Sequence, residues 1–158
     1  MNISILCVGK LKESFFREAV EEYKKRLSRF ASITVTEIPD QKIPDKASKK
    51  IEESILEKEG EMLLDKIKND SLVIAMCIEG KGVSSEELAG LIQEKSMNYS
   101  NICFVIGGSL GLSEAVKKRA DLRVSFGKIT LPHQLMRVVL CEQIYRAFKI
   151  NANESYHK

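Results

Sequence analysis

The residues best suited to chemistry in this sequence lie in its last third. Gly107 and Gly108 follow the apolar run 102–106, and the loop 127–131 follows the apolar run 122–126. A ligand can approach glycine closely because glycine has no Cβ, and open α/β sheets bind ligands at the carboxyl ends of parallel strands. From the residues alone, the glycine pair is either part of a ligand site or a tight turn between a strand and a helix.

The spacing of these glycines excludes two common classes of enzyme. The motif reads G-G-x-x-G over residues 107–111, and the next acidic residue, Asp121, lies too close to Gly111 for a dinucleotide-binding fingerprint. The sequence also contains no G-x-x-x-x-G-K-[ST] phosphate loop. Dinucleotide-dependent hydride transfer and P-loop nucleotide hydrolysis are therefore not expected.

A predicted final helix over 132–150 carries an arginine on its apolar side. Arg137 falls within an arc formed by Met136, Leu140, Cys141, Ile144, Ala147 and Phe148. An unpaired buried charge costs several kcal/mol, so Arg137 needs a partner. The sequence leaves open whether that partner lies at the rim of the core, across a subunit interface or in a functional site. Glu142 and Arg146 are spaced i,i+4, which predicts an ion pair.

Both histidines belong to this region. His133 lies in the first turn of the predicted helix, where it has either a structural or a catalytic role. His157 stands between Tyr156 and Lys158 at the end of the chain. Together these three offer a stacking ring, a group that titrates near neutral pH and a cation that binds phosphate. The alternative is a frayed terminal tail.

Alternating strands and helices must position these residues. The expected strands cover 3–8, 33–38, 72–77, 102–106 and 122–126. The expected helices cover 14–30 with Ser14 as N-cap, 46–69, a segment opened by a capping box at 84–87, a short segment capped by Ser113, and 132–150. This pattern predicts one α/β domain over 1–158, with a mainly parallel sheet flanked by helices. The segment 78–83 is expected to be a third loop at the ligand end of the sheet.

Composition excludes several classes of protein. The chain has 158 residues, of which 44% are hydrophobic and 30% charged, so disorder is not expected. No apolar run approaches the length of a membrane span, and the first residues resemble no targeting signal, which predicts a cytoplasmic protein without a membrane partner. The four cysteines lie in apolar runs without metal-ligand spacing, and they are expected to be buried free thiols with no metal.

Positive charge is concentrated at one end of the chain. Residues 1–70 carry 14 basic and 14 acidic groups, residues 71–116 carry 2 and 5, and residues 117–158 carry 9 and 3. The whole surplus behind the net charge of +3 therefore lies in the last quarter. Such a segment is either a solvated basic face or a docking surface for a polyanion such as nucleic acid.

Several long motifs, in the same order, resemble the ribosomal large-subunit pseudouridine methyltransferases of the SPOUT class. These motifs are VGKLK at 8–12, FVIGGSLGL at 104–112, SFGKITLPHQ at 125–134, RVVL at 137–140, EQIYRAF at 142–148 and YHK at 156–158. The resemblance covers essentially the whole chain. Two sites differ from relatives: Ser155 replaces a frequent proline or alanine, and Gly127 replaces a frequent serine.

This resemblance implies a fold, a reaction and partners. The fold would be a SPOUT-type sheet with a C-terminal trefoil knot, an exception to the rule against threaded chains. The protein would be a homodimer that transfers a methyl group from S-adenosylmethionine to N3 of a pseudouridine in helix 69 of 23S rRNA, on the assembled 70S ribosome. By motif position, the cofactor-binding residues would be Met76, Gly107, Gly108, Phe126, Gly127, Lys128, Ile129, Thr130 and Leu131.

The resemblance also implies roles for the last helix and the tail. His157 would be the general base or would orient the base, Tyr156 would stack on the nucleobase, and Arg137 would complete the catalytic group. Arg146 and Lys158 would bind RNA. The apolar arc of the last helix would form the dimer interface, and the tail of one subunit would complete the site of the other. Two rival functions are a non-catalytic RNA-binding protein and a SPOUT methyltransferase that acts on another RNA.

Overall fold

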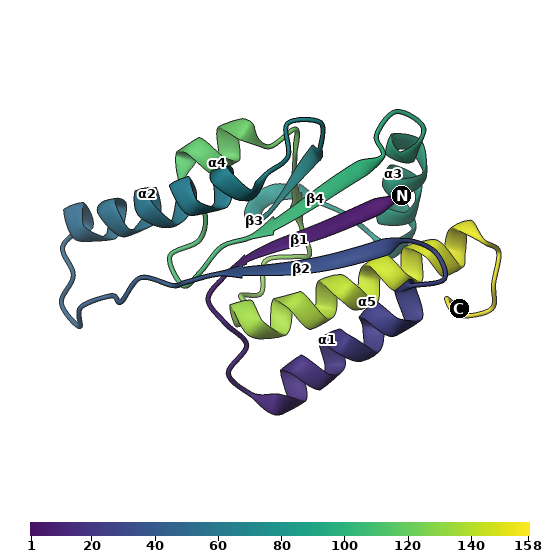
Figure 1. Cartoon of the computed structure of the whole chain (residues 1–158), viewed down its shortest axis with the longest axis horizontal. Helices are drawn as coiled ribbons and strands as arrows, with labels where there is room; N and C mark the ends of the chain where they lie inside the picture. The colour runs from purple at the N-terminus through teal and green to yellow at the C-terminus, as the bar shows by residue number, and fades with distance from the viewer.

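Three layers make up the computed structural model, which describes residues 1–158. A central five-stranded sheet lies between helices on its two faces (Figure 1). In chain order the elements are β1 (Asn2–Val8), α1 (Ser14–Leu27), β2 (Ser32–Ile38), α2 (Lys49–Lys66), β3 (Leu72–Gly82), α3 (Ser85–Ser96), β4 (Asn101–Ile106), α4 (Glu114–Arg119), β5 (Leu122–Ser125) and α5 (His133–Asn151). The predicted α/β fold class is confirmed.

All neighbouring strands are parallel, in the order β2-β1-β4-β3-β5. Their carboxyl ends therefore meet at one edge of the sheet. The loops 107–111 and 126–132 both start from this edge, as does the chain after β2. The trefoil knot remains an expectation drawn from the family resemblance.

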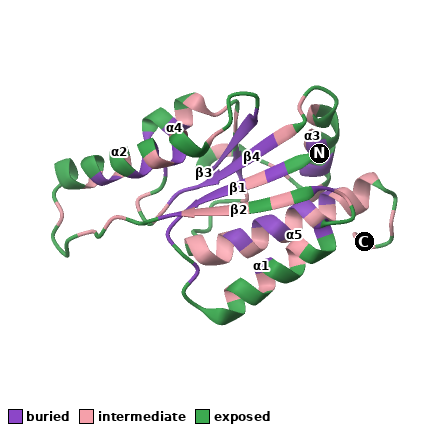
Figure 2. Cartoon of the chain, viewed as in Figure 1, coloured by how far each residue is buried: buried purple, intermediate pink, exposed green.

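Each face of the sheet buries its own hydrophobic core. Residues alternate along β1, so that Ile3 and Ile5 face α1, α3 and α5, whereas Leu6 and Val8 face α2 and α4. Burial on both faces explains why the strands are nearly continuous apolar runs in the sequence. In Figure 2 the central strands β1 and β4 and the first half of β3 are mainly buried, whereas the edge strand β2 is half-buried or exposed along most of its length.

Strand β3 is longer than predicted, and the expectation of a loop at 78–83 is wrong. The strand continues to Gly82 through a register shift between Met76 and Lys81, after which Lys81 pairs with Val124. Gly80 permits this shift, because a Cβ there would lie 2.7 Å from the backbone of Val124. The bulge preserves the contact with β5 while redirecting the strand.

Helix boundaries confirm some predicted caps and correct another. The Ser84 side chain and Glu87 form the predicted capping box of α3, and Ser113 caps α4. Ser14 is not the N-cap of α1, because the helix already includes it and Glu13 occupies the cap without a side-chain hydrogen bond. No helix is long and apolar enough to cross a membrane.

Helix α5 packs between α1 and α3, with its apolar arc turned inward. Leu140, Cys141, Ile144 and Ala147 are fully buried within the chain. The expectation that this arc is the dimer interface is therefore wrong, because the sheet of the same subunit already covers its centre.

Candidate functional site

A cavity of about 840 Å³ lies at the carboxyl edge of β3, β4 and β5. Its walls come from the ends of these strands, the loop 107–112, the loop 126–132 and the start of α5. This volume falls within the range typical of small-molecule sites. The segments are far apart in sequence and meet because parallel strands end at the same edge.

The glycine loop owes its shape to a tight turn. A Cβ on Gly107 would collide with the carbonyl oxygen of Gly111, and Gly111 itself has a φ of +85°. Gly108 and Gly111 form an isolated bridge that closes the turn. Gly107 is thus required by the turn, and the turn also places Gly107 and Gly108 in the cavity wall. The tight-turn interpretation is therefore confirmed, and the ligand-site interpretation stays a prediction for which this cavity is the candidate.

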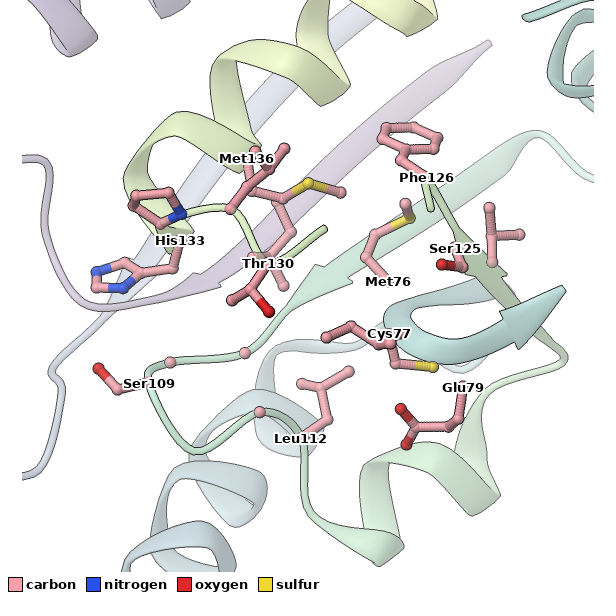
Figure 3. A pocket seen from close by; sticks show the side chains of 18 of the residues that line it. Met76, Cys77, Glu79, Ser109, Leu112, Ser125, Phe126, Thr130, His133 and Met136 are labelled. Carbon is pink, nitrogen blue, oxygen red and sulfur yellow. The ribbon is translucent and has the colours of Figure 1, made fainter. Parts of the chain in front are cut away.

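Polar side chains lie at both ends of the cavity. Figure 3 shows Met76 and Thr130 between Glu79 at one end and Ser109 with His133 at the other. An ion pair joins Glu79 to Lys117, which lowers the pKa of the carboxyl group and raises that of the amine. Burial, followed by the charge of Arg137, lowers the pKa of His133. His133 is therefore a neutral imidazole near pH 7.

The cavity wall includes all but one of the predicted cofactor-binding residues. Met76, Gly107, Gly108, Phe126, Gly127, Ile129, Thr130 and Leu131 line it, whereas Lys128 does not. Three further residues outside this predicted set also line the cavity: Glu79, Lys117 and Ser109. No local sequence pattern indicates that Glu79 and Lys117 form a pair, because they lie on different elements and 38 residues apart in the sequence.

Arg137 is fully buried and held inside its own chain. Its guanidinium donates to Glu37 Oε1 at 2.7 Å and to the carbonyl oxygens of Val8 and Gly9 at 2.8 and 2.7 Å. Glu37 also accepts from the backbone of Leu11 at 2.9 Å. Arg137 therefore holds the end of β1 and the following turn in place. It does not line the cavity, and it forms no hydrogen bond with the tail.

The terminal tail folds back along α5 instead of fraying. The Tyr156 ring lies 5.0 Å from the Tyr145 ring and 4.7 Å from the guanidinium of Arg146. His157 Nε2 lies 2.6 Å from Glu86 Oε1, and its Nδ1 lies 3.2 Å from Arg146 NH1. Arg146 also makes the predicted pair with Glu142, at 2.6 Å. Glu86, which the sequence analysis did not single out, has its pKa lowered to about 2 by a backbone hydrogen bond and by His157.

A single chain does not bring the tail and the cavity together. The cavity contacts the first turn of α5 through His133 and Met136, whereas Tyr156 and His157 pack near Glu142 and Arg146. Neither tail residue lines the cavity. The predicted catalytic and cofactor-binding residues thus form two separate groups in one subunit.

The cavity residues fit a nucleoside-based cofactor such as S-adenosylmethionine. Apolar side chains of Met76, Phe126 and Leu131 can contact a flat ring system, and the glycine turn exposes backbone groups for hydroxyl groups to bind. No group of three or more His, Cys, Asp or Glu residues could hold a metal ion. Three of the four cysteines are buried, Cys77 is half-buried, and all are free thiols.

A cavity at the carboxyl edge of an all-parallel sheet is where open α/β proteins bind their ligands, and this chain is a protein of that class. The sequence pattern of the family described as "Predicted SPOUT methyltransferase" matches residues 1–157. The chain belongs to this family, and it is a methyltransferase.

Proteins that are similar to this chain over its whole length have a more specific name. Proteins named "Ribosomal RNA large subunit methyltransferase H" from Lactobacillus acidophilus and Clostridium botulinum are 57% and 54% identical to this chain, with all of each sequence covered. The protein of that name from Oenococcus oeni is 56% identical over 100% of this chain and 99% of its own. A solved structure of a probable methylase family protein from Haemophilus influenzae aligns with a TM-score of 0.53 at 16% identity, over 99% of this chain and 70% of the other, and shows the fold alone.

Proposed function

We propose that this protein transfers the methyl group of S-adenosylmethionine to N3 of a pseudouridine in helix 69 of 23S rRNA, on the assembled 70S ribosome. The names of the full-length relatives support a large-subunit rRNA substrate. The basic segment 117–158 supports a polyanionic partner. One observation carries the proposal: the same chain has a cavity of the size of the cofactor and, apart from it, a tail with Tyr, His and Lys side chains.

The cavity residues would hold the cofactor and exclude water. Bound there, S-adenosylmethionine supplies an electrophilic methyl group on its sulfonium. The loop 126–131 and the glycine turn would orient it, as the family resemblance implies. Lys128 does not line the cavity, and it would act only if the loop rearranged on binding.

His157 would accept the N3 proton of the nucleobase. In the structure Arg146 donates to Nδ1, which places the ring proton on Nε2, where Glu86 accepts it. If Arg146 turned towards an RNA phosphate, the lone pair of Nδ1 would become available. The N3 proton would then pass to His157 as the N3–CH₃ bond forms and the S–CH₃ bond breaks, leaving S-adenosylhomocysteine.

Other tail residues would hold the RNA. Tyr156 would stack on the nucleobase, while Arg146 and Lys158 would bind phosphate oxygens. Arg137 would act as a positioning residue, because it is enclosed by Glu37 and by backbone carbonyl oxygens. It would affect catalysis indirectly, by holding the turn after β1 in place.

A homodimer would unite the two groups. Leu135 and Val139 are half-buried, pack against neither core and share a face of α5 with Glu142 and Arg146. This outer stripe, defined as Leu135, Val139, Glu142 and Arg146, would pair with its copy. In such a dimer the tail of one subunit would reach the cavity of the other.

The decisive experiment measures methyl transfer from labelled S-adenosylmethionine to 70S particles, free large subunits and naked 23S rRNA. We expect transfer only to 70S particles, with a new stop of reverse transcription in helix 69, because N3-methylation blocks Watson–Crick pairing. Ribosomes with uridine in place of the pseudouridines of helix 69 serve as the control. Equal transfer to those ribosomes, or transfer to another RNA, would contradict the proposed substrate.

Deleting residues 155–158 tests the tail. We expect calorimetry to show unchanged cofactor binding, because the tail does not line the cavity, and we expect methyl transfer to be lost. Intact transfer by the truncated protein would exclude a catalytic tail.

A further inference from the structure

A buried carboxylate beside the glycine turn takes no part in the mechanism above. Glu59, in α2, is only 5% exposed. Its Oε1 accepts a hydrogen bond from the backbone N–H of Gln41 at 2.9 Å, which is the one hydrogen bond the side chain makes. Burial raises the pKa of Glu59, so its charge is costly as it stands. A cation bound beside Glu59 would offset this cost of ionising the carboxylate.

The second oxygen of Glu59 faces the glycine turn. Glu59 Oε2 lies 3.4 Å from the position that a Cβ on Gly108 would occupy. It borders a compartment of about 270 Å³ whose wall also includes Asp40, Lys42 and Ser109. Glycine at position 108 thus leaves open the approach from the turn to this oxygen.

This compartment adjoins the cofactor cavity. Gly108, Ser109, Leu110 and His133 line both, and Figure 3 shows Ser109 and His133 at the same end of the larger cavity. A cofactor in the larger cavity can therefore extend one end over the glycine turn towards Glu59.

The charges differ between the two spaces. In the cofactor cavity, Glu79 and Lys117 neutralise each other through their ion pair. The smaller compartment has two carboxylates, Asp40 and Glu59, against the single cation Lys42, since the lowered pKa of His133 keeps its ring neutral. A small negative compartment next to a neutral cavity suits the cationic end of an extended ligand.

We propose that Glu59 binds the α-ammonium group of the methyl donor's amino-acid moiety, in the compartment next to the glycine turn. This inference rests on the proposed function, because it assumes S-adenosylmethionine as the donor. Oε2 accepts from the ammonium, while Oε1 keeps its bond to Gln41. The residue thus selects for the amino group of the cofactor and anchors the segment after β2.

The test compares S-adenosylhomocysteine with its analogue in which hydrogen replaces the amino group, by calorimetry. For the wild-type protein we expect the analogue to bind about 10 to 100 times more weakly, as for loss of a charge-assisted hydrogen bond. Glu59→Gln keeps an oxygen for Gln41 but removes the charge. It should bind both ligands about equally, at the affinity of the wild type for the analogue.

Matched controls lie on the same helix. Glu57→Gln and Glu61→Gln change exposed carboxylates of α2 and should retain the wild-type preference. Thermal unfolding of Glu59→Gln checks that the fold persists. If that variant unfolds, Glu59→Asp, which keeps the charge but shortens the reach, should show a reduced preference.

Three results separate the inference from the proposed function. A wild-type protein that binds neither ligand would overturn the proposed cofactor. Equal binding of both ligands by the wild type would overturn the ammonium site alone. A preference that persists in Glu59→Gln would show that Glu59 only anchors the segment 39–43.

Discussion

At the scale of single residues, Arg137 illustrates how much one buried charge depends on its surroundings. Glu37 and two carbonyl oxygens compensate a guanidinium that has no access to solvent. Only its Nε lacks a partner. The side chain links the end of β1, the carboxyl end of β2 and the start of α5, and of these three elements only α5 contributes residues to the cavity wall.

Replacing Arg137 should destabilise the fold. Arg137→Met keeps much of the side-chain volume but leaves Glu37 and two carbonyl oxygens without their donor. We expect the free energy of unfolding to fall by about 3 kcal/mol, measured by urea denaturation. Arg26→Met, which removes an exposed ion pair with Glu22 on α1, should cost much less. Equal losses in the two variants would contradict the structural role of Arg137.

His133 should make stability depend on pH. Burial and Arg137 lower its pKa from 6.5 in the folded state, so the unfolded chain binds a proton more readily. The contribution of neutral His133 to the free energy of unfolding is therefore fully present above the pKa of the unfolded chain. It decreases as pH falls below about 6.5. Between pH 7 and about pH 5, the wild type should lose more stability than His133→Gln in urea denaturation. If the wild type and His133→Gln lost the same stability over this pH range, the contribution of His133 would be contradicted.

At the scale of elements, α5 carries two different faces. Its inward face completes the core, and its outer stripe combines two half-buried apolar side chains with the Glu142–Arg146 pair. The same helix begins at the cavity with His133, and the tail folds back onto it at Arg146, which lies 13 residues further along, or about 20 Å at 1.5 Å per residue. One helix therefore separates the two groups that the proposed reaction would bring together.

Charging the outer stripe should separate the subunits. Val139→Glu places two carboxylates against each other across the proposed two-fold axis. At one protein concentration, we expect sedimentation velocity to show dimers for the wild type and monomers for this variant. Ile51→Glu, which changes an exposed apolar residue of α2, should leave the dimer intact. A Val139→Glu protein that stays dimeric would place the interface elsewhere.

At the scale of the whole molecule, the separation of tail and cavity predicts complementation between two inactive variants. One lacks residues 155–158, and the other, Met76→Trp, fills the cavity that Met76 lines. After subunit exchange, about half of the dimers are mixed, and each has one complete site if the tail acts in trans. Methyl transfer should then recover to about a quarter of the wild-type rate. No recovery would indicate that tail and cavity of the same chain work together.

The sequence alone determined the layers of this fold and much of its ligand site. Apolar runs closed by glycine or followed by helix caps identify buried parallel strands, because such strands need hydrophobic residues on both faces. Parallel strands share a carboxyl edge, so the glycine turn and the loop 127–131 could be placed together before any coordinates were known. The long motifs then indicated the family.

Only the tertiary structure decided which groups meet. Arg137 and Glu37 are 100 residues apart and lack a local pattern that would pair them. The extension of β3 depends on its contact with β5, and the inward direction of the α5 arc depends on its position between α1 and α3. Glu59 belongs to the proposed ammonium site because α2 places its carboxylate next to Gly108 of the glycine turn. Local periodicity determines strands and helices, whereas contacts between distant segments follow from how the layers pack.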